Sequence, residues 1–218
     1  FTETIKIDDA TLRTIVSHLE NISLSKTDLD TKGLAFEQFM DGFFKGDFGQ
    51  YFTPRPLIQA IVDAIRPKPG ETICDPACGT GGFLLAAHDY LVKHYPTMTK
   101  EEKKRLKEGT FKGWELVQAV ARLCAMNLLL HGIGSQEEEP ISVADSLAAD
   151  TGERYSIVLT NPPFGKKSSI QIVGQEGDVN REKQTYERDD FWATTSNKQL
   201  NFLQHVKTLL AINGRAAV

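Results

Sequence analysis

The sequence predicts an α/β fold: a doubly wound, mostly parallel sheet with helices on both faces, preceded by a helical segment. Short apolar segments alternate with longer segments whose apolar residues recur at helical spacing, which is typical of strands joined by helical crossovers. A glycine-rich turn joins the first strand candidate of the sheet to the next helix. The 218 residues, 40% of them hydrophobic and 25% charged, suffice for an ordinary core without disulfides.

Composition and charge exclude several classes of protein. No apolar run approaches the ~18 residues of a membrane span and no signal peptide is evident, so we expect a cytoplasmic protein with no membrane partner. Cys74, Cys78 and Cys124 are an odd number without a second metal-binding pair, so neither a disulfide framework nor a zinc site is expected. The formal net charge of −4 means that a firm hold on nucleic acid needs a local basic patch or a partner.

Two domains are expected, a helical segment at 1–48 and a larger domain at 49–218. Apolar residues at helical spacing between 7 and 19, and an aromatic-rich stripe at 36–44, are typical of a core or docking face rather than a cofactor site. Because the chain begins at Phe1 rather than Met and stops within a strand candidate, we expect it to be part of a longer protein.

The larger domain begins with a loop that turns into a helix. Thr53 is the expected N-cap, Pro54 suits the first turn, and apolar residues at 57–65 follow at helical spacing until Pro67. The remaining helices are expected at 83–92, 100–107, 116–130 and 198–210, and the strands at 72–74, 111–114, 141–143 and 155–160, with a fifth from about Arg215.

The glycine turn is the first of three unusual segments at strand ends, which is where open α/β sheets bind ligands. It reads Asp75-Pro76-Ala77-Cys78-Gly79-Thr80-Gly81-Gly82. Its glycines let the backbone turn tightly and approach a ligand, and the free N–H groups of the following helix suit carboxylates or phosphates. The spacing differs from the dinucleotide pattern G-x-G-x-x-G, and a purely structural turn explains the glycines equally well.

Glu115, directly after the strand at 111–114, is the second segment. A carboxylate at the end of the second strand can accept hydrogen bonds from both hydroxyls of a ribose. It follows Asp75 by 40 residues, more than the ~20 of a minimal unit, and the charged helix at 100–107 accounts for the excess. A solvated glutamate at a helix start is the alternative.

The third segment, Asn161-Pro162-Pro163-Phe164-Gly165, follows the strand at 155–160. Two prolines fix φ and remove two N–H donors, which leaves rigid carbonyl acceptors beside an amide and an aromatic ring. Such a rim suits a flat group with an exocyclic NH2. That group would donate to the Asn161 side-chain oxygen and the Pro162 carbonyl while its ring stacks on Phe164.

These motifs resemble those of the amino-methylating DNA methyltransferases that use S-adenosylmethionine. With the upstream Gln50-Tyr51-Phe52-Thr53-Pro54-Arg55, the chain is similar over about residues 33–218 to the modification (M) subunit of type I restriction-modification systems. Further agreement lies in Gly113-Trp114-Glu115, Asn127-Leu128-Leu129-Leu130-His131-Gly132, Ala144-Asp145-Ser146-Leu147 and Gly214-Arg215-Ala216-Ala217-Val218.

The resemblance implies a Rossmann-like sheet, truncated here after its fifth strand, and a role for each motif. Residues 50–55 would close over the methionine end of the cofactor, Glu115 would hold its ribose and Asp145 its adenine amine. Asn161 to Phe164 would hold the target adenine. The implied cofactor-binding residues are Gln50, Tyr51, Phe52, Thr53, Pro54, Arg55, Asp75, Ala77, Gly79, Thr80, Gly81, Gly82, Glu115, Asp145 and Asn161, and the implied catalytic residues are Asn161, Pro162, Pro163 and Phe164.

The implied activity is methyl transfer to the exocyclic N6 of an adenine flipped out of DNA, by in-line displacement without a strong general base. Asn-Pro-Pro-aromatic motifs also serve methylation of protein glutamines and of RNA bases, and residues 50–55 favour DNA among these acceptors. A non-catalytic cofactor-binding module is a further alternative, against which the complete motif at 161–164 argues.

The resemblance also implies partners. These are double-stranded DNA, a specificity subunit that chooses the target sequence, a restriction subunit and a second copy of the chain. Residues 165–197 are expected to form a long loop without structure of its own, mobile beside the base pocket and ordered on DNA.

Overall fold

The computed structural model describes residues 7–22, 53–135, 137–163, 169–173, 179–183 and 185–218. The chain divides into two compact units, 1–45 and 46–218. The first contains helix α1 (Asp9–Leu19), whose N-cap Asp8 accepts a hydrogen bond from the amide of Thr11 at 2.9 Å. Apolar side chains at helical spacing on α1 are exposed, and the aromatic stripe at 36–44 lies outside the described residues.

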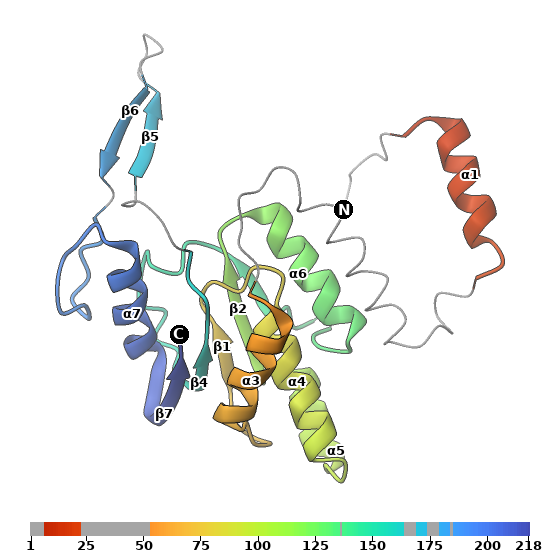
Figure 1. Ribbon diagram of the computed structural model, residues 1–218, viewed down its shortest axis with the longest axis horizontal. Coiled ribbons are helices and arrows are strands. Elements are labelled where there is room, and N and C mark those ends of the chain that lie inside the picture. Colours follow the sequence, from red (N-terminus) through yellow and green to blue (C-terminus); the bar gives the residue numbers. More distant parts are fainter. Residues whose placement is uncertain (1–6, 23–52, 136, 164–168, 174–178, 184) are drawn as a thin grey trace. The chain divides into compact units, whose positions relative to one another are not determined.

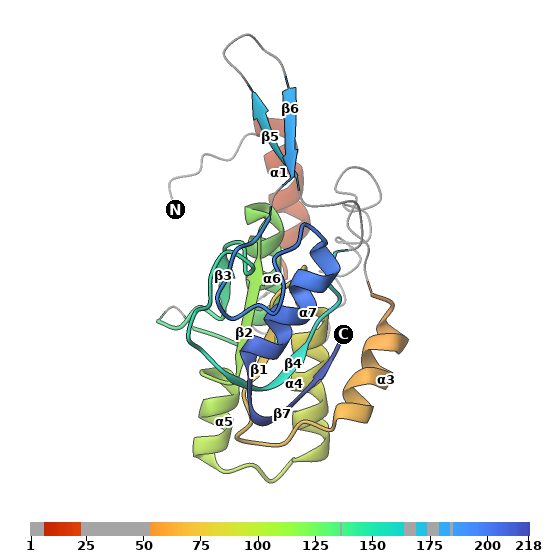
Figure 2. The same cartoon turned by 90° about the vertical axis from the view of Figure 1, so that its left-hand side faces the viewer.

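The second unit is built on a five-stranded parallel sheet in the order β3-β2-β1-β4-β7. Figure 1 shows β2, β1, β4 and β7 of this sheet, and Figure 2 also labels β3. The strand order reverses between β1 and β4, which pair directly. That reversal is the topological switch point at which open α/β sheets bind ligands. The strands are β1 (Ile73–Asp75), β2 (Phe111–Glu115), β3 (Ile141–Val143), β4 (Tyr155–Leu159) and β7 (Leu210–Ala217).

Helices cover both faces of this sheet, because successive strand residues point to opposite sides. Ile73 and Ile157 pack with α3, α4 and α6 in one core, whereas Cys74 and Val158 pack with α7 in another, and Figure 2 shows α7 in front of the sheet. The helices are α3 (Arg55–Ile65), α4 (Gly82–His94), α5 (Lys100–Lys107), α6 (Gln118–Leu130) and α7 (Lys198–Leu209). The predicted doubly wound fold is therefore confirmed.

Two predicted boundaries are wrong. The N-cap of α3 is Pro54 rather than Thr53, and no side chain caps the helix, because the Thr53 hydroxyl is engaged elsewhere in the fold. Strand β7 begins at Leu210 rather than near Arg215, since Leu210 already pairs with Tyr155 before an irregularity shifts the register.

The predicted loop at 165–197 is also wrong for the residues that the structure describes. Strands β5 (Ser169–Val173) and β6 (Val179–Lys183) form an antiparallel hairpin, and Tyr186 and Thr195 form an isolated antiparallel bridge. The alternation of Ile170 and Ile172 with polar residues is the strand signal. Mobility of this stretch and its ordering on DNA stay predictions.

None of the helices in the described parts of the chain combines the length and apolar character that a membrane crossing requires.

Candidate functional site

The loops after β1 and β4 emerge side by side at the switch point of the sheet. Ile73 pairs with Ile157 and Cys74 with Val158, so the glycine loop after Asp75 and the motif beginning at Asn161 leave adjacent strands at the same sheet edge. The sequence places these segments 86 positions apart along the chain, from 75 to 161. Parallel pairing of their strands brings them together.

The glycine loop is a tight backbone cradle. Gly79 and Gly81 adopt φ values of +52° and +86°, a region that L side chains rarely occupy. A Cβ added at Gly81 would lie 2.9 Å from the Sγ atom of Cys124 on α6, so no side chain fits there without movement. The Cys78 amide donates to the carbonyl oxygen of Trp114 at 2.9 Å, which ties the loop to β2.

Asp75 places a carboxyl group at the base of this cradle. It is 1% exposed, and its Oδ1 accepts the amide of Ala77 at 3.0 Å. Burial raises the pKa of Asp75 to about 7, and the charge of Glu115 acts in the same direction. The nearby Thr160 hydroxyl opposes this rise in the pKa of Asp75, because it can donate to the ionised carboxylate. The hydroxyl is buried, and its geometry in the described structure falls short of a standard hydrogen bond.

Glu115 lies at the end of β2 and faces the same cradle. Its carboxylate is 8% exposed and accepts hydrogen bonds from the amides of Gly79 at 3.2 Å and Val117 at 2.8 Å. These amides hold the carboxylate in place, and each of its oxygens can accept a second hydrogen bond. Glu115 is therefore a buried, hydrogen-bonded carboxylate rather than a solvated residue at a helix start.

Asn161 joins the upstream segment to the end of β4. Its Nδ2 donates to the Oγ1 of Thr53 at 2.9 Å. The side-chain NH2 is therefore directed at Thr53, which leaves the Oδ1 of the amide available as an acceptor. Pro162 is buried and Pro163 is exposed.

Asp145 follows β3, the strand next to β2. Its Oδ1 accepts the amide of Leu147 at 3.0 Å, and its Oδ2 accepts the hydroxyl of Tyr186 at 2.7 Å. Three carboxylates thus lie at the carboxyl ends of three neighbouring strands: Asp75 is the last residue of β1, Glu115 is the last residue of β2, and Asp145 follows β3 by two residues. A row of acceptors of this kind suits a ligand with an amino group at one end, hydroxyls in the middle and an amine at the other end.

Four further expected site residues lie at the start of α3 or in the glycine loop. Pro54 and Arg55 are exposed at the start of α3, and Ala77 packs beside the apolar cluster of Leu147 and Tyr186. The carbonyl oxygen of Thr80 accepts a hydrogen bond from Asn127 of α6. The expected site residues Gln50, Tyr51, Phe52 and Phe164 lie outside the described residues.

Sequence reasoning gave no role to three residues that support the site, although Asn127 and Ser146 lie within motifs that carry the resemblance. The Nδ2 of Asn127 donates to the carbonyl oxygen of Thr80 at 3.1 Å, while its Oδ1 is buried without a partner among the described residues. The hydroxyl of Ser146 donates to the carbonyl oxygen of Pro76 at 2.8 Å. Tyr186 contacts Asp145 from a distant segment. Asn127 carried a local signal as well, since it is a polar residue between Met126 and Leu128.

Within the described residues, no three His, Cys, Asp or Glu side chains are grouped as metal ligands would be. Cys78 and Cys124 are free thiols with their Sγ atoms 3.9 Å apart in the core beneath the glycine loop. The neighbouring thiol and burial raise the pKa of Cys78, which makes it an unreactive packing residue.

The chain matches known proteins over most of its length. A family model described as N-6 DNA Methylase matches residues 27–218. The methylase subunit of the type I restriction enzyme EcoEI of Escherichia coli is 35% identical over 214 residues, which are 95% of this chain and 40% of that protein. The EcoKI methylase subunit of Escherichia coli K12 is 37% identical over 182 residues, 80% of this chain and 31% of that protein.

Solved structures agree. The EcoKI M protein superposes with a TM-score of 0.62 at 33% identity, covering 96% of this chain and 40% of that one. A chain from a structural study of the type I R-M system gives a TM-score of 0.74 at 26% identity. The match covers 96% of the present chain and 41% of the other. The present chain thus spans about 40% or less of these curated relatives. With its switch-point site, fold and sequence in agreement, the chain belongs to the N-6 DNA methylase family and is similar to the modification subunits of type I restriction enzymes.

Proposed function

We propose that this chain carries the methyl-transfer site of an adenine-specific DNA methyltransferase, the catalytic subunit of a type I restriction-modification system. The observation that carries the proposal is the hydrogen bond of Asn161 to Thr53 beside the cradle of Asp75, because it joins the acceptor motif to the cofactor site. Family membership supports the same reaction.

The residues of the cradle fit S-adenosylmethionine. Two glycines with positive φ would make room for the amino-acid end of the cofactor, and the buried carboxyl of Asp75, when ionised, would accept hydrogen bonds from its ammonium group. Glu115 would accept the ribose hydroxyls and Asp145 the amine of the adenine. When bound there, the cofactor supplies an electrophilic methyl group on a sulfonium.

Asn161 and Pro162 would act on the acceptor. The N6 lone pair of adenine is delocalised into the ring and is a poor nucleophile. If the Asn161 Oδ1 and the Pro162 carbonyl accept the two N6 hydrogens, the nitrogen turns its lone pair out of the ring plane toward the methyl group. Positioning of this kind can lower the barrier by up to ~7–11 kcal/mol. As the bond from N6 to the methyl carbon forms, the bond from that carbon to sulfur breaks and leaves a neutral thioether. N6 becomes acidic only once it is methylated and then releases one proton to solvent, so no strong base is needed before attack.

The target base has to leave the duplex to reach the site, at a cost of a few kcal/mol. Stacking on Phe164 would return ~1–3 kcal/mol. The chain's net charge of −4 gives little electrostatic hold on phosphates, so a specificity subunit would supply the grip and the target sequence. A restriction subunit and a second copy of the chain would complete the assembly in the cytoplasm.

The proposal is tested by the Asn161→Ala substitution in the full-length protein, in the assembly with which it purifies. Labelled methyl transfer to genomic DNA from cells lacking the gene should be abolished, because the amide acceptor is lost. The dissociation constant for S-adenosylmethionine, measured by calorimetry, should change less than about threefold. Normal turnover by this variant would refute the assigned role of Asn161.

Methylation of a protein glutamine or of an RNA base remains the competing acceptor chemistry for the same motif. Parallel assays with labelled cofactor against duplex DNA, RNA and protein from the same cells distinguish these. Label that appears at adenine N6 in DNA alone supports the proposal, and label confined to protein or RNA contradicts it. Cofactor binding without transfer to any of the three would indicate a non-catalytic module.

A further inference from the structure

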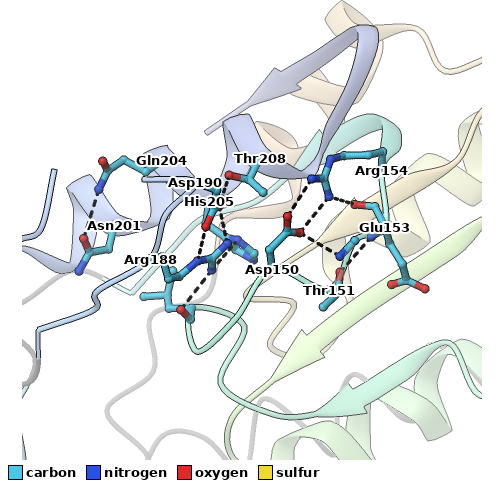
Figure 3. Close-up of polar contacts among 12 residues, drawn as sticks. Asp150, Thr151, Glu153, Arg154, Arg188, Asp190, Asn201, Gln204, His205 and Thr208 are labelled. Carbon is cyan, nitrogen blue, oxygen red and sulfur yellow. Dashed lines mark hydrogen bonds and ion pairs between the residues drawn. The ribbon is translucent and has the colours of Figure 1, made fainter. Parts of the chain in front are cut away.

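Residues 185–197, here called the strap, contain an ion pair, Arg188–Asp190, whose two members also contact the rest of the domain. The side chain of Arg188 is 5% exposed, and its Nε and Nη2 donate to Asp190 at 2.9 and 2.6 Å (Figure 3). Its Nη1 lies 3.1 Å from the carbonyl oxygen of Leu147 and 3.2 Å from the Nδ1 of His205. One side chain of the strap thus reaches both the loop after β3 and helix α7.

Backbone contacts fix the far end of the strap to α7. The amide of Ala193 donates to the Oε1 of Gln204 at 2.8 Å, and the Nε2 of Gln204 donates back to the carbonyl oxygen of Ala193 at 3.1 Å. The Nδ2 of Asn201 donates to the carbonyl oxygen of Thr195, which itself bridges to Tyr186. Hydrogen bonds therefore attach both the first and the last part of the strap to the rest of the domain.

The strap presents Tyr186 to Asp145. The Tyr186 ring is 9% exposed and packs with Leu147 and Phe202, next to Ala77 of the glycine loop. Its hydroxyl donates to the Asp145 Oδ2 at 2.7 Å. Burial raises the pKa of Tyr186, with Asp145 adding to the effect, so the hydroxyl stays protonated and keeps donating.

Each oxygen of Asp145 therefore has one fixed donor, Tyr186 on Oδ2 and the amide of Leu147 on Oδ1. A carboxylate oxygen can accept two hydrogen bonds, so each retains one further acceptor direction. The two donors fix the orientation of the Asp145 carboxylate plane. That orientation determines the directions from which a further donor can approach its oxygens. Loss of either donor leaves the side chain free to rotate.

We propose that Tyr186 is a positioning residue that orients Asp145 and thereby sets the selectivity of the site for a cofactor whose purine carries an exocyclic amine. The proposal rests on the proposed function and adds the residue that enforces one part of it. It also gives the strap a role in the site, because the segment that follows the acceptor motif closes onto the loop that reads the cofactor.

Binding of two ligands to the full-length protein tests this. One is S-adenosylhomocysteine, and the other is the same molecule with hydrogen in place of the 6-amino group. A hydrogen bond from the amine to a fixed carboxylate should give the unmodified protein about 10- to 100-fold preference for the first. Tyr186→Phe should reduce that preference to about threefold, by weakening only the binding of the amine-bearing ligand.

Tyr155→Phe is the matched control, because the Tyr155 hydroxyl also donates to a carboxylate, that of Glu153 at 2.8 Å, away from Asp145. It should keep the full preference. In an Asp145→Asn background, Tyr186→Phe should change the preference no further, since its effect passes through Asp145.

The outcomes separate the two proposals. If S-adenosylhomocysteine binds and Tyr186→Phe retains the preference, or weakens both ligands equally, the strap is merely structural and this inference is overturned. If the unmodified protein binds neither S-adenosylhomocysteine nor S-adenosylmethionine, the proposed function fails and the inference with it.

Discussion

Thr53 illustrates how a single side chain acquires a role that its local sequence does not suggest. It accepts the Asn161 Nδ2 at 2.9 Å, which holds the amide with its oxygen available. Thr53→Val keeps the shape but removes the acceptor, so the amide can turn its NH2 toward the base. We expect kcat for DNA methylation to fall about tenfold, the equivalent of one hydrogen bond of ~1.4 kcal/mol. Steady-state kinetics should show this, with the cofactor dissociation constant changed less than threefold.

Thr53→Ser is the matched control, because it keeps the hydroxyl and should retain near-normal kcat. If Thr53→Val instead weakened cofactor binding and left kcat intact, Thr53 would act on the cofactor alone.

Asp75 should make cofactor binding depend on pH. Its pKa of about 7 means that the carboxyl is mostly protonated at pH 6 and mostly ionised at pH 8. A cationic ligand favours the ionised form, so the cofactor should bind about tenfold more tightly at pH 8 than at pH 6. Calorimetric titrations at several pH values measure this. Asp75→Asn should bind weakly without this dependence, and an identical slope in the variant would assign it to another group.

At the scale of elements, the glycine loop depends on α6 lying directly beneath it. Gly81→Ala puts a Cβ at φ +86° and 2.9 Å from the Cys124 Sγ. Positive φ costs ~1–2 kcal/mol and overpacking ~1–3 kcal/mol, so we expect a loss of about 2–5 kcal/mol in the free energy of unfolding. Urea denaturation of the 218-residue chain measures it.

Gly70→Ala is the control, since Gly70 has φ +91° with no atom within 4 Å of an added Cβ. It should lose only the ~1–2 kcal/mol of backbone strain. Adding Cys124→Ala to Gly81→Ala should relieve the contact. Equal losses at the two glycines would show that the close approach to Cys124 costs nothing.

Helix and strand positions follow from sequence periodicity, but their ends do not. The charged helix α5 begins and ends at the predicted Lys100 and Lys107, because Thr99 and Glu102 form a capping box within four residues. At α3, by contrast, the preferred N-cap Thr53 is drawn away by Asn161, a residue far along the chain. Local signals place an end correctly only where no distant partner competes for the same group.

The whole molecule carries two buried titratable groups whose effects on folding stability oppose each other. Burial lowers the pKa of His205 to about 4, and the Arg188 cation adds to this. The neutral imidazole therefore contributes its full share to the free energy of unfolding above pH 6.5. That contribution is lost as the pH falls toward 4. The raised pKa of Asp75 has the reverse effect. Its carboxyl favours the folded state below its unfolded pKa of 3.8, and that advantage is lost as pH rises through about 7.

The two shifts largely offset each other between pH 4.5 and 6.5, at ~3 and ~4 kcal/mol for full titration. His205→Asn removes one of them while keeping an acceptor for Arg188. Relative to the unmodified chain, this variant should gain about 2.5 kcal/mol of stability on going from pH 7.5 to pH 4.5. Urea unfolding at both values measures the gain. A difference that does not change with pH would show that His205 titrates normally in the folded chain.

Local sequence was sufficient for the alternation of strands and helices, the acidic residue at or just beyond the end of each of three strands and the motif at Asn161, because periodicity and turn chemistry act over a few residues. Tertiary packing decided the rest. It placed β1 beside β4, gave Thr53 and Ser146 their partners, and folded the strap back onto Asp145. These contacts join residues tens of positions apart, and their energies arise only when the sheet has assembled. No pattern in a short window of sequence can report them.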